Sequence, residues 1–290
     1  VPDIDVLWSG LPGGSSYFEY HRGITHSFVM APILAAACCA IAKYTRQASI
    51  NVRLFAVAVL GVLSHLLLDW TNVYGIRLLL PFSSKWYRGD MTEIIDPIIL
   101  AILFLSLFAP MLANLVVGEI GAKKGTATLT WARFALVALL GYESARFVAH
   151  ARALAMIQSH LYGGSVEPRF TVVPARLGLL TWRGIVEGED YVVNSLVDIT
   201  GEYNPADGHV DYPTLRSPMI DAARNTSVFD AFLRFNQVPF WRVIPTGDFI
   251  RVELLDLRFG PPWAPGFAAA SALVNPDGHI REAHLGLGGR

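Results

Sequence analysis

The chain has 290 residues, of which 53% are hydrophobic and only 16% charged, and its net charge at pH 7 is -1. Soluble domains carry about 25% charged residues, so this composition excludes disorder and indicates a membrane-embedded portion. The nearly balanced charge gives no general attraction to nucleic acid, and no nucleic-acid partner is expected. The two cysteines, Cys38 and Cys39, are adjacent, which excludes a disulfide scaffold and a cysteine-rich zinc motif.

Four apolar segments follow one another in the first half of the chain. They cover residues 25–44, 52–70, 94–117 and 131–149. Each reaches roughly the 20 residues that a membrane-spanning helix needs, and the linkers between them are short. The alternative for each segment is a buried helix in a large soluble domain. We therefore predict an α-helical membrane bundle of about four transmembrane helices.

The composition changes in the second half, where prolines, charges and turn signals accumulate. Short alternating segments predict strands, and one periodic segment predicts a helix. The strands are expected at 170–173, 185–193, 241–244 and 249–257, and the helix at 220–236. The chain is thus predicted to consist of a membrane-embedded helical domain, 1–150, and a soluble, mostly-β (α+β) domain, 165–290.

The alternation of the predicted spans also places the polar segments. Lys and Arg in the loop after the first span and in the loop before the fourth favour the cytoplasmic side for those loops. Residues 1–27, the loop 71–93 and the C-terminal domain are then expected together on the other side. Polar residues from these parts are therefore expected at one face of the membrane.

His65 and Asp69 lie four residues apart in the second apolar segment. On a helix this spacing puts both side chains on one face, about one turn apart, where they can share one metal ion. The alternative is a hydrogen-bonded pair that pins the bundle. Because ionisable side chains are costly inside an apolar span, the pair indicates a metal or catalytic site.

Two further pairs precede the first span. His21 and His26 are five residues apart, which fits a loop residue followed by one in the first turn of a helix. Asp3 and Asp5 alternate in an expected extended segment, so both carboxylates point the same way and can bridge a divalent cation. Solvated acids in a turn are the alternative for that pair. Taken alone each pair is weak, but the topology brings both to the face that carries the second-span pair.

Two more carboxylates, Asp90 and Asp96, lie at the entry to the third span. Asp96 precedes Pro97, which suits the first turn of a helix, so it is either an N-cap or a member of the site. Trp86 and Tyr87 are typical of interfacial anchors.

The clustered residue types indicate metal-assisted hydrolysis. Mixed histidine and carboxylate ligands suit zinc, manganese or iron better than calcium or magnesium. A bound metal lowers the pKa of its water, and a spare carboxylate can act as general base. The motifs of serine hydrolases, nucleotide-binding proteins and zincins are absent from the sequence.

Three motifs in this order carry a family resemblance: Pro2-Asp3-Ile4-Asp5, His21-Arg22-Gly23-Ile24-Thr25-His26-Ser27 and Ser64-His65-Leu66-Leu67-Leu68-Asp69. Together they resemble the YdjM-like family of bacterial membrane-bound, metal-dependent hydrolases. The similarity covers roughly residues 1–100 and is weaker over 165–260. It implies an integral protein of the bacterial inner membrane with a divalent metal. Family members usually carry an apolar stretch with another histidine before the first motif, so the chain, which opens without Met, is expected to continue a longer protein.

The resemblance also implies a set of site residues, namely Asp3, Asp5, His21, His26, His65 and Asp69. Of these, His26, His65, Asp69, His21 and Asp5 are the expected metal ligands, and Asp3, Asp5 and His21 the expected catalytic residues. The expected partners are membrane lipid and a small-molecule or lipid-linked substrate, such as a phosphoester.

Two other functions stay open at this point. One is a non-enzymatic integral membrane protein with a structural His/Asp cluster and a partner-binding C-terminal domain. The other is a transporter of metal ions or protons, although few ionisable residues lie mid-span apart from Glu143 and Arg146 in the fourth, which have the spacing to pair with each other.

Overall fold

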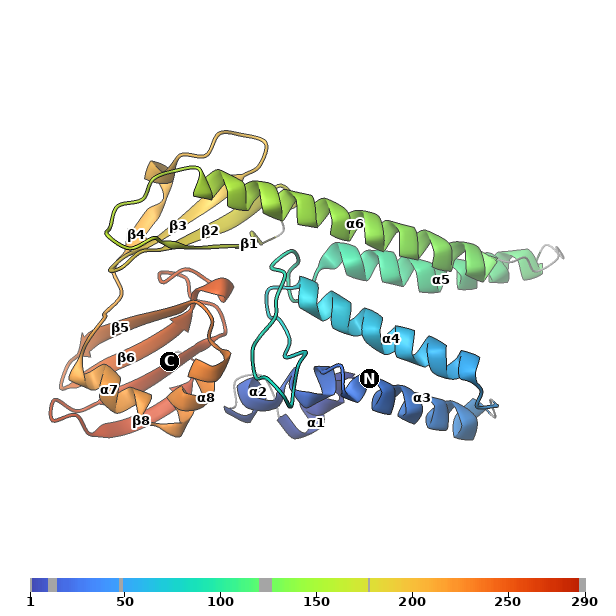
Figure 1. Ribbon diagram of the computed structural model, residues 1–290, viewed down its shortest axis with the longest axis horizontal. Helices are drawn as coiled ribbons and strands as arrows, with labels where there is room; N and C mark the ends of the chain where they lie inside the picture. Colours follow the sequence, from blue (N-terminus) through green and yellow to red (C-terminus); the bar gives the residue numbers. More distant parts are fainter. Residues whose placement is uncertain (1, 10–14, 47–48, 120–126, 177, 287–290) are drawn as a thin grey trace.

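Helices form the first half of the chain and two β-sheets dominate the second (Figure 1). The computed structural model describes residues 2–9, 15–46, 49–119, 127–176 and 178–286. The first half contains η1 (Pro2–Asp5), α1 (Val6–Ser9), α2 (Ser15–Tyr20), η2 (Ile24–His26), α3 (Met30–Arg46), α4 (Val52–Thr71), α5 (Pro97–Glu119) and α6 (Ala127–Gln158). Helix α3 packs against α4, and α5 against α6.

The number of membrane spans differs from the prediction of about four. Among the described residues, α4 is the one helix long and apolar enough to cross a membrane. A second span is formed only if Ser16–His26 and Met30–Arg46, which meet at a bend of 79°, are counted together. The described apolar part of α5, Pro97–Leu112, is shorter, and α6 carries Arg133, Glu143 and Arg146 within its predicted span. Within the part of the chain that the structure describes, the expected count is therefore corrected to one or two.

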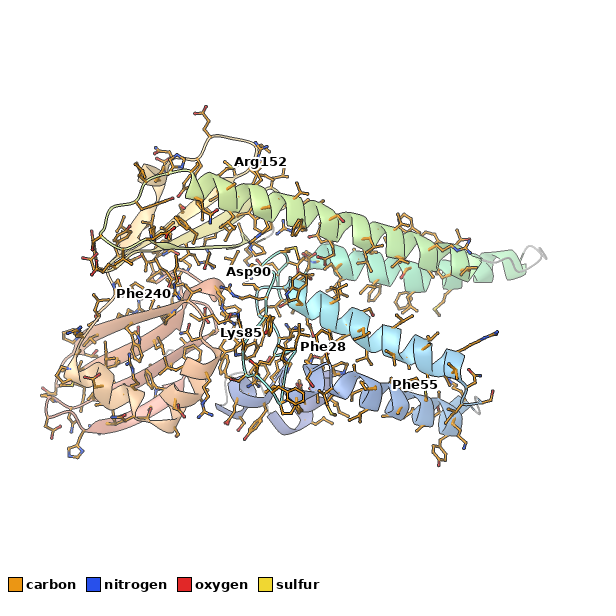
Figure 2. All side chains as sticks on the ribbon, in the orientation of Figure 1. Phe28, Phe55, Lys85, Asp90, Arg152 and Phe240 are labelled. Atoms are coloured by element: carbon orange, nitrogen blue, oxygen red, sulfur yellow. The ribbon has the colours of Figure 1, made fainter. Side chains whose placement is uncertain are left out.

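The surface of α4 is consistent with contact to lipid. Val52, Val57 and Leu60 are largely exposed along the helix, and Phe55 extends from the same helix in Figure 2. A helix that is apolar around most of its circumference and remains uncovered by protein is covered by lipid in a membrane protein.

Each β-sheet is an antiparallel meander of four strands. The first contains β1 (Arg169–Pro174), β2 (Thr181–Glu187), β3 (Val192–Asp198) and β4 (His209–Asp211), and the second β5 (Pro239–Thr246), β6 (Phe249–Asp256), β7 (Ala269–Val274) and β8 (Ile280–Leu285). Short helices complete this half: η3 (Pro205–Asp207), α7 (Pro218–Arg224), α8 (Ser227–Phe235) and η4 (Leu257–Phe259).

Two sequence-based predictions in this half merge separate elements. The predicted strand 185–193 covers the end of β2, a turn closed by the Gly188 amide donating to Tyr191, and the start of β3. The predicted helix 220–236 is interrupted because the Thr226 side chain accepts a hydrogen bond from the Phe229 amide and caps a new helix, α8.

The two halves share buried side chains. The C-terminal part of α6 lies on the first sheet, where Ala153 and Ile157 pack in the core with Trp182. Phe18 of α2 and Tyr74, which follows α4, are buried in the core of the second sheet. The N-terminal segment, the loop after α4 and the sheets therefore lie together at one end of the long helices, as the predicted topology requires (Figure 1).

Candidate metal centre

Helix α4 presents two of the site residues near its C-terminal end. His65 and Asp69 are one turn apart, and His65 Nε2 lies 3.2 Å from Asp69 Oδ2. Asp69 is buried, whereas the His65 side chain is about a third exposed. The predicted i, i+4 pair therefore forms on one face of the helix.

Asp3 and His26 complete a group of four. The ligand atoms of Asp3, His26, His65 and Asp69 all lie within 4.8 Å of one another. His26 Nε2 is 3.3 Å from both Asp3 Oδ1 and Asp69 Oδ2, and His65 Nε2 is 3.1 Å from Asp3 Oδ2. His26 is fully buried and Asp3 is half-exposed, so the group is reached from the Asp3 side.

Three atoms of this group point to a metal ligand set. His26 Nε2, His65 Nε2 and Asp69 Oδ2 are buried and have no hydrogen-bond partner among the described residues. Buried polar atoms without partners are rare because each costs about 1–3 kcal/mol. Here all three converge on one point, and two imidazoles with two carboxylates match the ligands and number of a four-coordinate divalent metal. The residues present thus fit such an ion.

The ionisation state of the Asp3 carboxyl suits the binding of a metal ion. The neighbouring His26 and His65 imidazoles hold the pKa of the Asp3 carboxyl well below its usual range. A carboxylate must be deprotonated to bind a metal. Asp3 is therefore in its ligating form at neutral pH.

A short relay behind His26 determines which of its ring nitrogens is free. The Thr25 hydroxyl donates to Asp5 Oδ2 over 2.9 Å, and His26 Nδ1 lies 3.0 Å from the same hydroxyl oxygen. Because that hydroxyl has given its hydrogen to Asp5, it accepts from Nδ1–H. Nε2 of His26 then faces the other three residues, and its lone pair becomes available to a metal when that nitrogen gives up its proton, an arrangement common behind metal-binding histidines.

Asp5 lies at the centre of this supporting layer. It accepts from the Arg22 amide over 2.9 Å and from the Thr25 hydroxyl, and its Oδ1 is 3.0 Å from His21 Nδ1. Burial raises the pKa of Asp5, but His21 and His26 outweigh it and leave that pKa below its usual value. Both Asp5 and His21 thus lie behind His26 and not among the four converging residues.

Arg22 supplies a contact that sequence reasoning missed. Its guanidinium lies 2.8 Å from Asp69 Oδ1 and donates to Asn72 Oδ1 over 2.9 Å. Its backbone is left-handed, with φ of 52°, and the next residue is Gly23, where a Cβ would lie 2.6 Å from the Tyr20 carbonyl oxygen. The signal for this role was an arginine beside a glycine between the two motif histidines.

The other two carboxylates lie outside the group of four. Asp90 binds the Arg88 guanidinium over 2.6 and 2.8 Å. Of the two roles left open for Asp96, the structure shows the N-cap of α5: it accepts from the Ile98 amide over 2.9 Å and also from the Tyr142 hydroxyl.

The predicted pair in the fourth span does not form. Glu143 accepts from the Thr71 hydroxyl, whereas Arg146 donates to backbone carbonyls of Met91, Gly178 and Leu179. The two side chains therefore join α6 to other elements.

An apolar helical region with a polar cluster at the end of α4 defines a membrane protein with a candidate metal centre. Comparison with known families supports this class: the model described as "YdjM inner membrane protein" matches residues 1–153, more than half of the chain. The chain belongs to this family and is an inner-membrane protein, as the motifs predicted.

The chain also has a relative that matches it over almost its whole length. The chain is 24% identical to the uncharacterized protein YfhP of Bacillus subtilis (strain 168) over 287 residues, which cover 99% of this chain and 82% of the relative. No solved structure matches the chain.

Proposed function

We propose that this protein is a metal-dependent hydrolase of the inner membrane, in which Asp3, His26, His65 and Asp69 hold a divalent zinc, manganese or iron ion. The observation that carries the proposal is the convergence on one point of three buried ligand atoms that form no well-directed hydrogen bond. When bound, such an ion lowers the pKa of a water molecule and polarises the bond to be cleaved.

The residues around the centre have separable tasks. Asp3 is the exposed member of the group, but its lowered pKa makes it a poor proton acceptor, so a ligand role suits it better than a general-base role. His21 is oriented by Asp5 through Nδ1, the arrangement that orients a histidine for general acid–base work. We assign proton transfer to His21, with Asp5 positioning both His21 and, through Thr25, His26.

The position of the cluster in the membrane protein favours one class of substrate. The cluster lies near the C-terminal end of α4, where a membrane-spanning helix meets water, and Asp3 opens it to the outside. A substrate held at the bilayer surface can reach such a site, which favours a phosphoester or a lipid-linked molecule.

A structural role is the second candidate, because the same contacts join the N-terminal segment to α4. Arg22 bridges to Asp69, and Asp3 reaches both His26 and His65. A non-enzymatic protein with a structural ion in this cluster would show the same geometry, and its C-terminal sheets would bind a partner.

Elemental analysis of the full chain, purified in detergent, tests the proposal. Wild type, His65→Ala and Asp69→Ala are compared with His279→Ala, which removes an exposed histidine far from the cluster in sequence. We expect close to one zinc, manganese or iron per chain in wild type and His279→Ala, and loss in the other two.

Activity then separates the two candidates. Metal-loaded protein is assayed on phosphomonoesters, phosphodiesters and lipid-linked phosphates, with and without chelator. Chelator-sensitive turnover that His65→Ala abolishes supports the hydrolase. A folded wild type that stays metal-free after divalent cations are supplied would refute the metal centre, and bound metal without turnover on any of these substrates would favour the structural role.

A further inference from the structure

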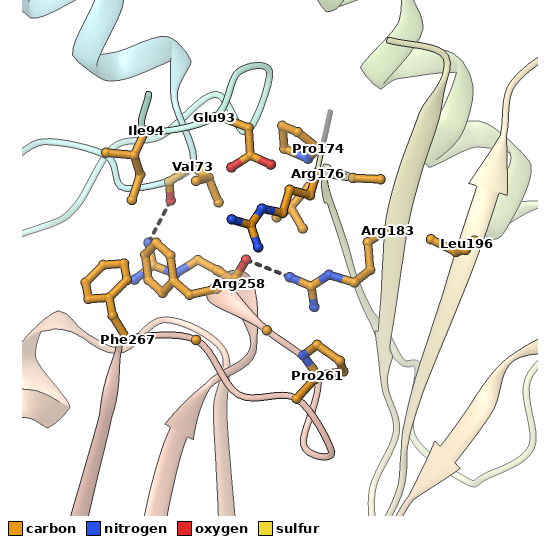
Figure 3. Close-up of a pocket in the computed structure, with 16 residues that line it drawn as sticks. Val73, Glu93, Ile94, Pro174, Arg176, Arg183, Leu196, Arg258, Pro261 and Phe267 are labelled. Atoms are coloured by element: carbon orange, nitrogen blue, oxygen red, sulfur yellow. Dashed lines mark hydrogen bonds between the residues drawn. The ribbon is translucent and has the colours of Figure 1, made fainter. Parts of the chain in front are cut away.

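A cavity of about 590 Å³ with several charged residues in its lining lies away from the four converging residues (Figure 3). Its walls come from the loop after α4, from the first sheet with the segment after β1, and from the loop after β6. Its charged lining consists of Glu93, Arg176, Arg183 and Arg258, with Phe267 on the apolar side. None of these residues belongs to the candidate metal centre.

The charges that line this cavity are not balanced. Arg258 is neutralised by Asp256, at 2.6 Å with both side chains fully buried. Among the described residues, Arg183 donates only to the backbone oxygens of Leu257 and Arg258, over 2.6 Å each. Burial lowers the pKa of Arg183 although the nearby Glu93 opposes this, as expected for a cation without a carboxylate in contact.

Arg176 and Glu93 face the same space. In Figure 3 the Arg176 guanidinium extends between Glu93 and Arg183. Within the described part of the chain, neither Arg176 nor Glu93 forms an ion pair or a side-chain hydrogen bond. Two guanidinium groups are thus left with free donors against a single unpaired carboxylate.

We propose that this cavity binds a phosphate-bearing ligand through Arg176 and Arg183. Guanidinium groups bind the oxygens of phosphate in paired, charge-assisted hydrogen bonds. The carboxylate of Glu93 repels a bare anion but accepts hydrogen bonds, so the preferred ligand carries a hydroxyl or amino group beside its phosphate. Glycerol 3-phosphate has this chemistry, and so does the headgroup of a phospholipid.

The cavity is continuous with the surroundings of the metal centre. Glu93, Ile94, Arg176 and Phe267 also line a neighbouring, more apolar cavity of about 580 Å³ that reaches His21 and Arg22. Arg258 in addition donates to the Val73 and Tyr74 carbonyl oxygens over 3.1 Å, directly after α4. The binding of a phosphate group here does not depend on the proposed hydrolase activity.

Calorimetry on the full chain in a neutral detergent tests the proposal for a soluble ligand. The protein is treated with chelator, so that phosphate cannot bind through a metal, and is titrated with glycerol 3-phosphate and with inorganic phosphate. Arg176→Gln is compared with Arg216→Gln, which removes an exposed arginine that does not line the cavity. Because Arg176 is itself exposed and unpaired, its substitution leaves the fold intact.

We expect Arg176→Gln to weaken glycerol 3-phosphate binding roughly tenfold, the value of one charge-assisted hydrogen bond, and Arg216→Gln to leave it unchanged. Glu93→Gln is expected to tighten inorganic phosphate and to reduce the preference for glycerol 3-phosphate. His65→Ala should bind both as wild type does, so a failed metal centre and a failed phosphate site give different results.

A second arm distinguishes a lipid headgroup from a free ligand. Native mass spectrometry of protein from phosphatidylglycerol nanodiscs is expected to show lipid retained by wild type and lost from Arg176→Gln if the ligand is a headgroup. If neither glycerol 3-phosphate affinity nor lipid retention differs between Arg176→Gln and Arg216→Gln, the proposal is overturned.

Discussion

Replacing Thr25 by Val is expected to weaken metal binding although Thr25 is not among the converging ligands. The hydroxyl of Thr25 lies between His26 Nδ1, at 3.0 Å, and Asp5 Oδ2, at 2.9 Å. All three residues are buried. Valine keeps the branched shape of the side chain, so the change removes the hydroxyl and opens no large cavity.

The size of the effect follows from what the neighbours keep. His26 Nδ1 loses its acceptor at 3.0 Å and is left with Asp5 Oδ2 at 3.3 Å. Asp5 loses one of three donors but keeps the Arg22 amide and His21. Losing such a supporting partner costs about 10- to 100-fold in metal affinity. Because Asp5 can partly replace the hydroxyl, we expect about tenfold, together with about 1–3 kcal/mol in stability for the weakened buried groups.

Competition with a chromophoric chelator measures the affinity, and thermal unfolding of the metal-free protein measures the stability. Thr25→Ser restores the hydroxyl and is expected to recover most of the affinity. The reasoning is refuted if Thr25→Val and Thr25→Ser bind metal equally tightly, since the tautomer of His26 would then be set by something other than the relay.

Three further outcomes are expected from the buried charges and from metal removal. Arg22→Met leaves the Asp69 carboxylate without its arginine partner, so the unfolding free energy of the metal-free protein should fall by about 3–5 kcal/mol. Added metal should recover part of this loss, and an equal loss with and without metal would contradict the pairing. Arg258→Met leaves the buried Asp256 carboxylate unpaired and should lower the unfolding free energy in chemical denaturation by about 3–5 kcal/mol. Arg152→Met, at an exposed position, should lower it by about 0.5 kcal/mol or less, and similar values for the two variants would show that the buried pair is dispensable. Protein kept at a free metal concentration of 100 Kd should lose about 2.7 kcal/mol of unfolding free energy when chelator removes the metal, which lowers its unfolding temperature. An unfolding temperature that chelator does not change would mean that no metal binds the folded state.

The helical part of the site could be predicted because a helix has a fixed period. The spacing of His65 and Asp69 determines their shared face on any helix, and the bounds of α4 agree with the predicted segment to one residue. The proline after Asp96 in the same way offered the N-cap as one of two roles, and the structure shows that one. Local rules sufficed where local geometry decides the outcome.

The different positions of the Asp3 and Asp5 side chains could not be predicted from residue spacing. An extended segment would point both carboxylates in one direction, but residues 2–5 form a 3-10 turn, η1, in which residues two apart point apart. Asp3 therefore reaches His26 and His65, whereas Asp5 turns inward to His21. Which conformation forms depends on the packing of η1 against η2, a contact between segments that sequence spacing does not encode.

The charge arrangement around the centre bears on the choice between a catalytic and a structural ion. A structural metal typically holds together ligands that would otherwise repel or stay unfolded, so its removal unfolds the site. Here each buried carboxylate has its own compensation: Asp69 is paired with Arg22, and Asp5 is held by the Arg22 amide and His21. The ligands are thus positioned by the protein before any ion binds, and the most exposed one, Asp3, is half-exposed. A centre built in this way should stay folded when its metal is removed and should lose no more than the roughly 2.7 kcal/mol of binding free energy expected at 100 Kd, whereas removal of a structural metal unfolds the site.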